Sequence, residues 1–193
     1  DPPAEAPAPA DHVIGWERGV PVSLDGKAMS GHAIVDTLSA RAAEYGIGHG
    51  IHVGETALGI KGRIGFEAGS ALILISAHRE LEKLVLTKWQ SFWKDQLGTF
   101  YGDRLHEGHY FDPTLRDIEA MVRSSQQKVT GETRVRLAPG RFLVTGARSP
   151  WSMMDRAVAT YGEENVLWAR DEGKAFARVG ATPGSPAMRA DAR

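Results

Sequence analysis

Residues 45–78, YGIGHGIHVGETALGIKGRIGFEAGSALILISAH, are the stretch from which the fold of this chain is best read. The stretch is rich in glycine, and such a density of glycine indicates unusual backbone dihedral angles or a close approach of the backbone to another group. Lys61 and Arg63 follow the glycines, so an anionic or carboxylate-bearing ligand is a natural candidate. Because loops carry function more often than the elements they connect, we expect a site to begin here. Five glycines fall within the first fifteen residues of the stretch: Gly46, Gly48, Gly50, Gly54 and Gly59.

Alternation, helical periodicity and capping residues predict the elements around this stretch. Residues 13–24 alternate apolar and polar side chains, which predicts two short strands that meet at Arg18 and Gly19. Ser30 is a good N-cap for a helix that runs to about Glu44. Three strand-like pieces and one long helix are expected next, at residues 49–53, 57–60 and 63–67 and at residues 71–86.

The second half of the chain predicts two helices and a hairpin. Aromatic and apolar residues recur at three- and four-residue intervals over residues 89–105, which predicts one buried helical stripe, in the core or at a subunit interface. Asp112 and Pro113 are typical of the first residues of another helix. Residues 133–146 predict a hairpin around a Pro-Gly turn. Strands and helices are segregated, which favours an α+β fold with a mixed, mainly antiparallel sheet packed with long helices.

Composition divides the chain into a linker, one domain and a tail. Residues 1–12 are rich in Pro and Ala and predict a semi-stiff linker. Residues 13–180 are expected to form the domain, and residues 181–193 a flexible C-terminal tail. The chain begins with Asp1 rather than methionine, so we expect that an upstream segment has been removed.

Charge and residue usage exclude several classes of function. The net charge is −1, from 23 basic and 24 acidic residues, and no dense basic cluster appears, so we expect no nucleic-acid partner. Cysteine is absent, which excludes disulfides, thiolate metal sites and thiol catalysis and fits a cytoplasmic protein. No stretch of 18 apolar residues exists, so we expect no membrane span.

Familiar nucleotide and metal motifs fail on spacing. The clustered glycines follow a helix rather than a strand, and residues 54–61 miss a P-loop because the lysine comes one residue late. On a strand, His49 and His52 would point to opposite faces, so hydrogen-bonding roles are favoured over joint metal ligation. Glu80 and Glu82 are most simply part of a solvated helix face.

Lys61, Arg63 and Glu67 are candidates for a role in ligand binding. They alternate on a probable strand, so all three side chains share one face. The residues alone leave ligand binding and a cross-strand charge pair or subunit contact equally open. No nucleophile-base pair or close carboxylate pair appears anywhere. The chain is therefore expected to contribute residues to a site rather than to contain a complete site.

Five collinear motifs give the chain a family resemblance. Over about residues 13–180 the chain resembles the C-terminal half of the argininosuccinate synthase family, in a divergent bacterial branch. The resemblance implies an ATP-dependent ligation of citrulline with aspartate that yields AMP and pyrophosphate in arginine biosynthesis. It also implies that ATP, with magnesium, is bound mainly by an N-terminal half, and that the C-terminal half builds a homotetramer with an extended C-terminal arm. The motifs are GVPVSLDG (19–26), YGIGHGIHVGETALGIKGRIGFEAG (45–69), AHRELEKLVLT (77–87), QQKVTGETRVRL (126–137) and ARSPWSM (147–153).

The resemblance also assigns site residues, and this sequence departs from the family at them. A glutamate and a tyrosine that contact citrulline in the family align with Gly54 and Phe66. Glu55 could replace the missing carboxylate, but an offset of one residue on a strand reverses the side chain. The expected acceptor wall therefore comprises Gly54, Glu55, Lys61, Arg63 and Phe66, and its changes favour an altered acceptor such as an N-acylated citrulline. Two other hypotheses stay open, a non-catalytic assembly module and an independent metal enzyme that uses two histidine pairs, His49 with His52 and His106 with His109.

Overall fold

A computed structural model of the chain describes residues 7–154 and 167–191. The chain divides into two compact units, Asp1–Met153 and Met154–Arg193. This boundary differs from the one expected from the sequence, which placed a single domain over residues 13–180.

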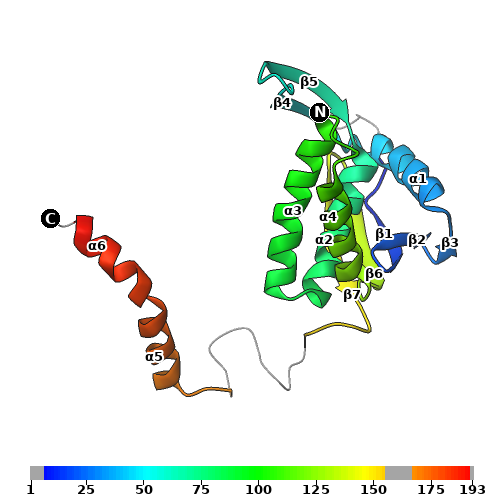
Figure 1. Ribbon diagram of the computed structural model, residues 1–193. Coiled ribbons are helices and arrows are strands. Elements are labelled where there is room, and N and C mark those ends of the chain that lie inside the picture. The colour runs from blue at the N-terminus through cyan, green and yellow to red at the C-terminus, as the bar shows by residue number, and fades with distance from the viewer. Residues whose placement is uncertain (1–6, 155–166, 192–193) are drawn as a thin grey trace. The chain divides into compact units, whose positions relative to one another are not determined.

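Five antiparallel strands form the main sheet of the first unit, in the order β3-β2-β1-β6-β7 (Figure 1). Strand β1 pairs with β2 on one side and with β6 on the other, so the N-terminal strands and the later hairpin share one sheet. The two predicted N-terminal strands, the predicted hairpin and the α+β fold are confirmed, and the described strands pair only in antiparallel fashion. The strands of this sheet are β1 (Ala10–Glu17), β2 (Val20–Leu24), β3 (Lys27–Ala28), β6 (Gly131–Ala138) and β7 (Arg141–Arg148).

The first strand begins at Ala10, three residues before the expected start of the domain. The side chain of His12 is buried, and the hydroxyl of Tyr45 donates a hydrogen bond of 2.7 Å to the carbonyl oxygen of Ala8. The end of the predicted linker over residues 1–12 therefore belongs to the folded unit. Its Pro/Ala-rich composition hides the strand because pairing with β6, rather than local propensity, sets where β1 begins.

Helices α1 (Gly31–Glu44) and α2 (Gly69–Val85) pack against one face of the sheet, and the other face is open. Within this core the indole nitrogen of Trp16 donates a hydrogen bond of 2.8 Å to the hydroxyl of Thr133, so both buried polar groups are satisfied. The most deeply buried apolar side chains come from the sheet and from both helices: Ile14, Ile34, Leu38, Ile73, Leu81, Val135 and Leu137.

Both predicted helix starts are present. The hydroxyl of Ser30 accepts from the backbone N–H of Ala33 at 3.2 Å, at the start of α1. The carboxylate of Asp112 accepts from the backbone N–H of Thr114 at 2.9 Å, at the start of α4 (Pro113–Gln126). A side-chain cap satisfies N–H groups that the first helical turn leaves without a partner, which is why these sequence signals were reliable.

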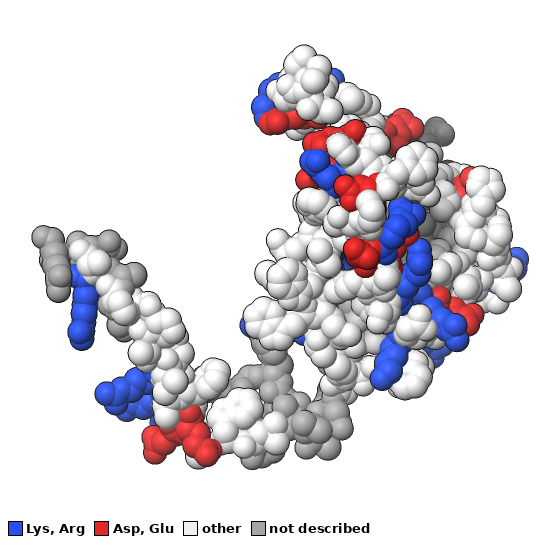
Figure 2. Space-filling model, in the orientation of Figure 1, with Lys and Arg blue, Asp and Glu red and all other residues white. Residues whose placement is uncertain are grey.

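The aromatic stripe lies on helix α3 (Lys88–His106), but it does not enter the core of this chain. Trp89 and Trp93 are 63% and 54% exposed, and no residue of α3 is buried. The side of α3 with the less exposed residues carries polar groups such as Lys94 and Tyr101, which interact with Glu82 and Glu119. Figure 2 shows the resulting large uncharged area over α3. The prediction that the stripe is buried in the core of this chain is wrong, whereas its role in a subunit contact stays a prediction.

Most of the described residues of the second unit are helical. They form α5 (Arg170–Gly180), the 3-10 turn η1 (Thr182–Gly184) and α6 (Ser185–Asp191). The flexible tail that we expected over residues 181–193 is therefore helical as far as Asp191.

Candidate functional site

A two-stranded antiparallel ribbon carries all five residues expected to form the acceptor wall. Strands β4 (His49–Glu55) and β5 (Lys61–Glu67) pair with each other and not with the main sheet (Figure 1). The strand expected at residues 57–60 is wrong, because these residues form the turn between β4 and β5. The backbone N–H of Thr56 donates to the carbonyl of Ile60 at 2.9 Å and closes this turn.

The base of the ribbon depends on one glycine. Gly48 has a φ of +103°, and a Cβ at this position would overlap the backbone of Gly69 at the start of α2. The backbone N–H of Ala68 donates to the carbonyl of Gly48 at 2.9 Å. The start of β4 and the end of β5 are therefore held together by a close backbone contact that only glycine at position 48 allows.

The register divides the ribbon into two faces, because directly paired residues of an antiparallel pair point to the same side. The first, which we call the charged face, carries the Glu55–Lys61 ion pair and an ion pair of 3.0 Å between His49 Nε2 and Glu67 Oε1. Its members are His49, Ile51, Val53, Glu55, Lys61, Arg63, Gly65 and Glu67.

The charged face confirms that Lys61, Arg63 and Glu67 share one side of the ribbon. Cross-strand charge pairs account for Lys61 and Glu67, which was one of the two readings left open. Arg63 lies opposite Val53, and within the described residues its guanidinium has no ion pair.

The opposite side, which we call the ring face, is made of three glycines, two rings and one aliphatic side chain. The far end of the Phe66 ring lies over Gly50, and the imidazole of His52 lies over Gly54. A Cβ at either glycine would overlap the ring above it, so these glycines provide space rather than a special dihedral angle. The members of the ring face are Gly50, His52, Gly54, Gly62, Ile64 and Phe66.

The expected wall residues are thus brought onto one ribbon but not onto one surface. Gly54 and Phe66 belong to the ring face, whereas Glu55, Lys61 and Arg63 belong to the charged face. The side chain of Glu55 is on the face opposite to position 54, because the side chains of adjacent strand residues point in opposite directions. His52 lies on the same face as Gly54 and Phe66 but was not among the expected wall residues, although its spacing of two residues from Gly54 was a usable signal.

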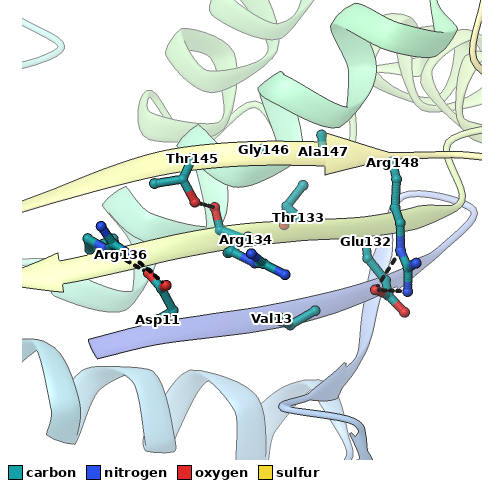
Figure 3. Close-up of a pocket in the computed structure, with 10 residues that line it drawn as sticks. All are labelled: Asp11, Val13, Glu132, Thr133, Arg134, Arg136, Thr145, Gly146, Ala147 and Arg148. Atoms are coloured by element: carbon teal, nitrogen blue, oxygen red, sulfur yellow. Dashed lines mark hydrogen bonds and ion pairs between the residues drawn. The ribbon is translucent and has the colours of Figure 1, made fainter. Parts of the chain in front are cut away.

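A second candidate is a hollow of about 520 Å³ on the open face of the main sheet (Figure 3). Arg136 binds Asp11 through two hydrogen bonds of 2.8 and 2.7 Å, and Arg148 binds Glu132 through two of 2.9 and 2.6 Å. The hydrogen bond from Arg136 lowers the pKa of the Asp11 carboxyl below its ordinary value. Between these pairs Arg134 has no carboxylate partner among the described residues.

The sequence alone does not predict this hollow, because its residues come from β1 and from the β6–β7 hairpin, which are far apart in the sequence. Arg134 lies between Val13 and Gly146 in the register, and both neighbours are small enough to leave room above the sheet. The sequence did contain one signal, because Arg134 and Arg136 are two residues apart in the predicted hairpin and so share one face of a strand.

A buried polar network joins three helices beside the core. His78 Nε2 and Gln126 Oε1 are 3.0 Å apart, and the Gln126 amide donates to Glu82 at 2.7 Å. Lys94 binds the same carboxylate at 3.1 Å. Burial lowers the pKa of His78, since it penalises the charged imidazole more than neighbouring Glu82 favours it. Glu82 is itself buried, so the prediction that it belongs to a solvated helix face is wrong. Glu80 lies on the exposed side of α2.

The described residues offer neither a metal cluster nor a spanning segment. No group of three or more His, Cys, Asp or Glu that could hold a metal ion occurs in the described ranges 7–154 and 167–191. The two histidines of β4 point to opposite faces, as their spacing predicts. Within the same ranges no helix has the length and apolar character needed to cross a membrane.

Comparison with known proteins places the whole ribbon and sheet within one family. The chain matches the family described as Arginosuccinate synthase C-terminal domain over residues 1–181. It is 40% identical over 166 residues to an argininosuccinate synthase of Xanthomonas campestris pv. campestris, covering 86% of this chain and 41% of that protein.

Two further relatives carry the same name. The argininosuccinate synthase of Synechococcus sp. (strain JA-3-3Ab) is 37% identical over 155 residues, which cover 80% of this chain and 38% of that protein. The argininosuccinate synthase of Staphylococcus aureus (strain JH9) is 35% identical over 164 residues, which cover 84% and 41%. The matches thus span about two fifths of these curated relatives. The chain belongs to the argininosuccinate synthase family and corresponds to its C-terminal domain.

Proposed function

We propose that this chain is the C-terminal part of an argininosuccinate synthase, a carbon–nitrogen ligase of arginine biosynthesis. The observation that carries the proposal is the family match over residues 1–181. The reaction joins citrulline, or an N-acyl citrulline, to aspartate and splits ATP to AMP and pyrophosphate. ATP and its magnesium ion are bound mainly by an N-terminal half, so we expect this chain alone to be inactive. We place the reaction in the cytoplasm.

In this proposal the ribbon forms the acceptor side of the site. One small acceptor cannot contact both faces of a ribbon at once, so the ring face, with Gly54 and Phe66, would contact it. Glu55, Lys61 and Arg63 would act from the other side, where the ribbon meets the N-terminal half. Arg63 is the candidate for a substrate or partner carboxylate, because Lys61 is already paired with Glu55.

The contribution of the ribbon to catalysis would be positioning. The ureido oxygen of the acceptor must reach ATP, and the amine of aspartate must then attack the activated carbon as AMP leaves. Holding the acceptor in one orientation lowers the entropic part of both barriers. No described residue is assigned the role of nucleophile or general base in this step.

The composition of the ring face supports an acylated acceptor. None of its six residues is acidic, and the carboxylate of Glu55 is on the opposite face. The ammonium group of free citrulline would therefore find no anionic partner on this wall. Isothermal titration of the complete enzyme with citrulline and with N-acetylcitrulline tests this, and a clear preference for free citrulline would end the acyl version.

Turnover measurements test the proposal as a whole. The chain joined to its N-terminal half should form argininosuccinate, or the acylated product, with one AMP and one pyrophosphate per bond formed. The 193-residue chain alone should release no AMP from ATP. Turnover by the chain alone would contradict the proposal, because it would mean that the energy-supplying site is here.

A non-catalytic assembly module is the second candidate. The observation that favours it is the outward aromatic face of α3, which suits a contact between copies in a homotetramer. A structure of the complete protein separates the two. If the ring face is sealed inside a subunit contact, the assembly function gains, and if it borders a cleft beside the nucleotide, the ligase function gains.

A further inference from the structure

We infer that His52 is the polar residue through which the ring face recognises the acceptor, by hydrogen bonding rather than by charge pairing. The inference rests on the proposed function, because it takes the ring face as the acceptor wall. It adds a specificity-determining residue that neither the sequence motifs nor the family match assigned.

The first argument is composition. Of the six residues on the ring face, His52 alone carries a polar side chain. Its neighbours across and along the ribbon are Gly54, Gly62 and Ile64, which offer no side-chain donor or acceptor. Any side-chain hydrogen bond from this face to a ligand must therefore involve the imidazole.

The second argument is space. The imidazole of His52 lies over Gly54, where a Cβ would overlap its Nε2 atom. Gly54 is paired with Gly62, and a Cβ at Gly62 would meet no atom within 4 Å. The imidazole thus lies over backbone atoms that carry no side chain, and the space beside it is open to a ligand.

The third argument is the absence of a competing partner. In the part of the chain that the structure describes, the ring nitrogens of His52 make no hydrogen bond or ion pair, whereas His49 on the other face binds Glu67 at 3.0 Å. A neutral imidazole has one donor and one acceptor nitrogen, so it suits an amide, a carbonyl or a carboxylate of the acceptor. It provides no fixed negative charge for an ammonium group.

Steady-state kinetics of the complete enzyme test the inference, with citrulline and N-acetylcitrulline as acceptors. His52→Ala should lower kcat/KM for the preferred acceptor by roughly tenfold, about the value of one hydrogen bond of 1.4 kcal/mol. The KM values for ATP and aspartate should change by less than about twofold, because His52 is expected to contact only the acceptor. His52→Gln, which keeps a donor and an acceptor, should recover part of the loss.

His49→Ala is the matched control, since it removes an exposed imidazole from the same strand but from the charged face. It should leave kcat/KM for the acceptor within about twofold of the unsubstituted enzyme. Gly54→Ala is a second variant, and it should act like His52→Ala because the added methyl group displaces the ring. Circular dichroism of each variant establishes that the fold is kept.

Three results would overturn the inference. One is unchanged acceptor kinetics in His52→Ala, and another is an equal loss in His49→Ala, which would indicate a general effect on the ribbon. The third is a loss in His52→Ala that falls on ATP or aspartate instead of the acceptor. An unsubstituted enzyme that ligates neither acceptor would overturn the proposed function itself, and that failure is recognisable before any variant is made.

Discussion

At the scale of single residues, Gly48 holds the most constrained backbone of the candidate site. Its φ of +103° disfavours every other residue, and its Cα faces the backbone of Gly69 rather than a side chain that could move. Gly48→Ala should therefore lower the free energy of unfolding by about 2 kcal/mol or more, measured by urea denaturation. Ile47, next to it, is buried in the core, so a backbone shift caused by the substitution would also disturb the packing of the core.

Gly62→Ala is the control for that prediction. Gly62 lies on the same ribbon, where a Cβ would meet no atom within 4 Å. Its substitution should change the free energy of unfolding by less than about 0.5 kcal/mol. Equal effects of the two substitutions would mean that the Gly48–Gly69 contact does not constrain the base of the ribbon.

At the scale of elements, the histidine of the buried network should make folding depend on pH. The pKa of His78 is lowered in the folded chain from its ordinary value of 6.5, mainly by burial. The unfolded chain then binds the proton more readily, so the free energy of unfolding should fall as the pH drops below 6.5. It should level off once the pH passes below the folded pKa. Around the imidazole, Glu82 opposes this shift whereas Lys94 adds to it.

Urea denaturation between pH 7.5 and 5.5 measures this dependence. His78→Gln keeps a hydrogen-bonding group but does not titrate, so its stability should vary less over the same interval. His32→Gln is the control, because the side chain of His32 is 88% exposed and its change should leave the pH profile as it was. A profile for His78→Gln that parallels the unsubstituted chain would contradict the prediction.

The ion pair between Glu82 and Lys94 should be the strong electrostatic contact between α2 and α3. Both side chains are largely buried, and Glu82 also accepts from Gln126. A double-mutant cycle with Glu82→Gln and Lys94→Met should give a coupling above about 1.5 kcal/mol. The exposed pair Glu80–Lys83, on α2 itself, is the matched control and should couple by less than about 0.5 kcal/mol. Similar couplings would mean that burial adds nothing to this contact.

At the scale of the whole molecule, the outward aromatic face of α3 is expected to join copies of the protein. Trp93→Glu places a charge within that face and should shift the molecular mass toward smaller species, measured by light scattering after size exclusion. Folding should be unaffected, because Trp93 is 54% exposed in this chain. Asp117→Lys, an exposed change on α4, should leave the mass unchanged. An unaltered mass for Trp93→Glu would remove α3 from the interface.

The sequence alone determined most of the local elements, the caps of α1 and α4 and the family, while the tertiary structure decided which side chains face one another. Ser30, Asp112 and the alternation of β6 act over a few residues, where periodicity and capping follow from backbone geometry. The separation of Gly54 from Glu55 follows from the pairing of β4 with β5, and the exposure of the α3 aromatics from which helices cover the sheet. Register and the choice of buried face are set by contacts between distant segments, whose energies no short window of sequence contains.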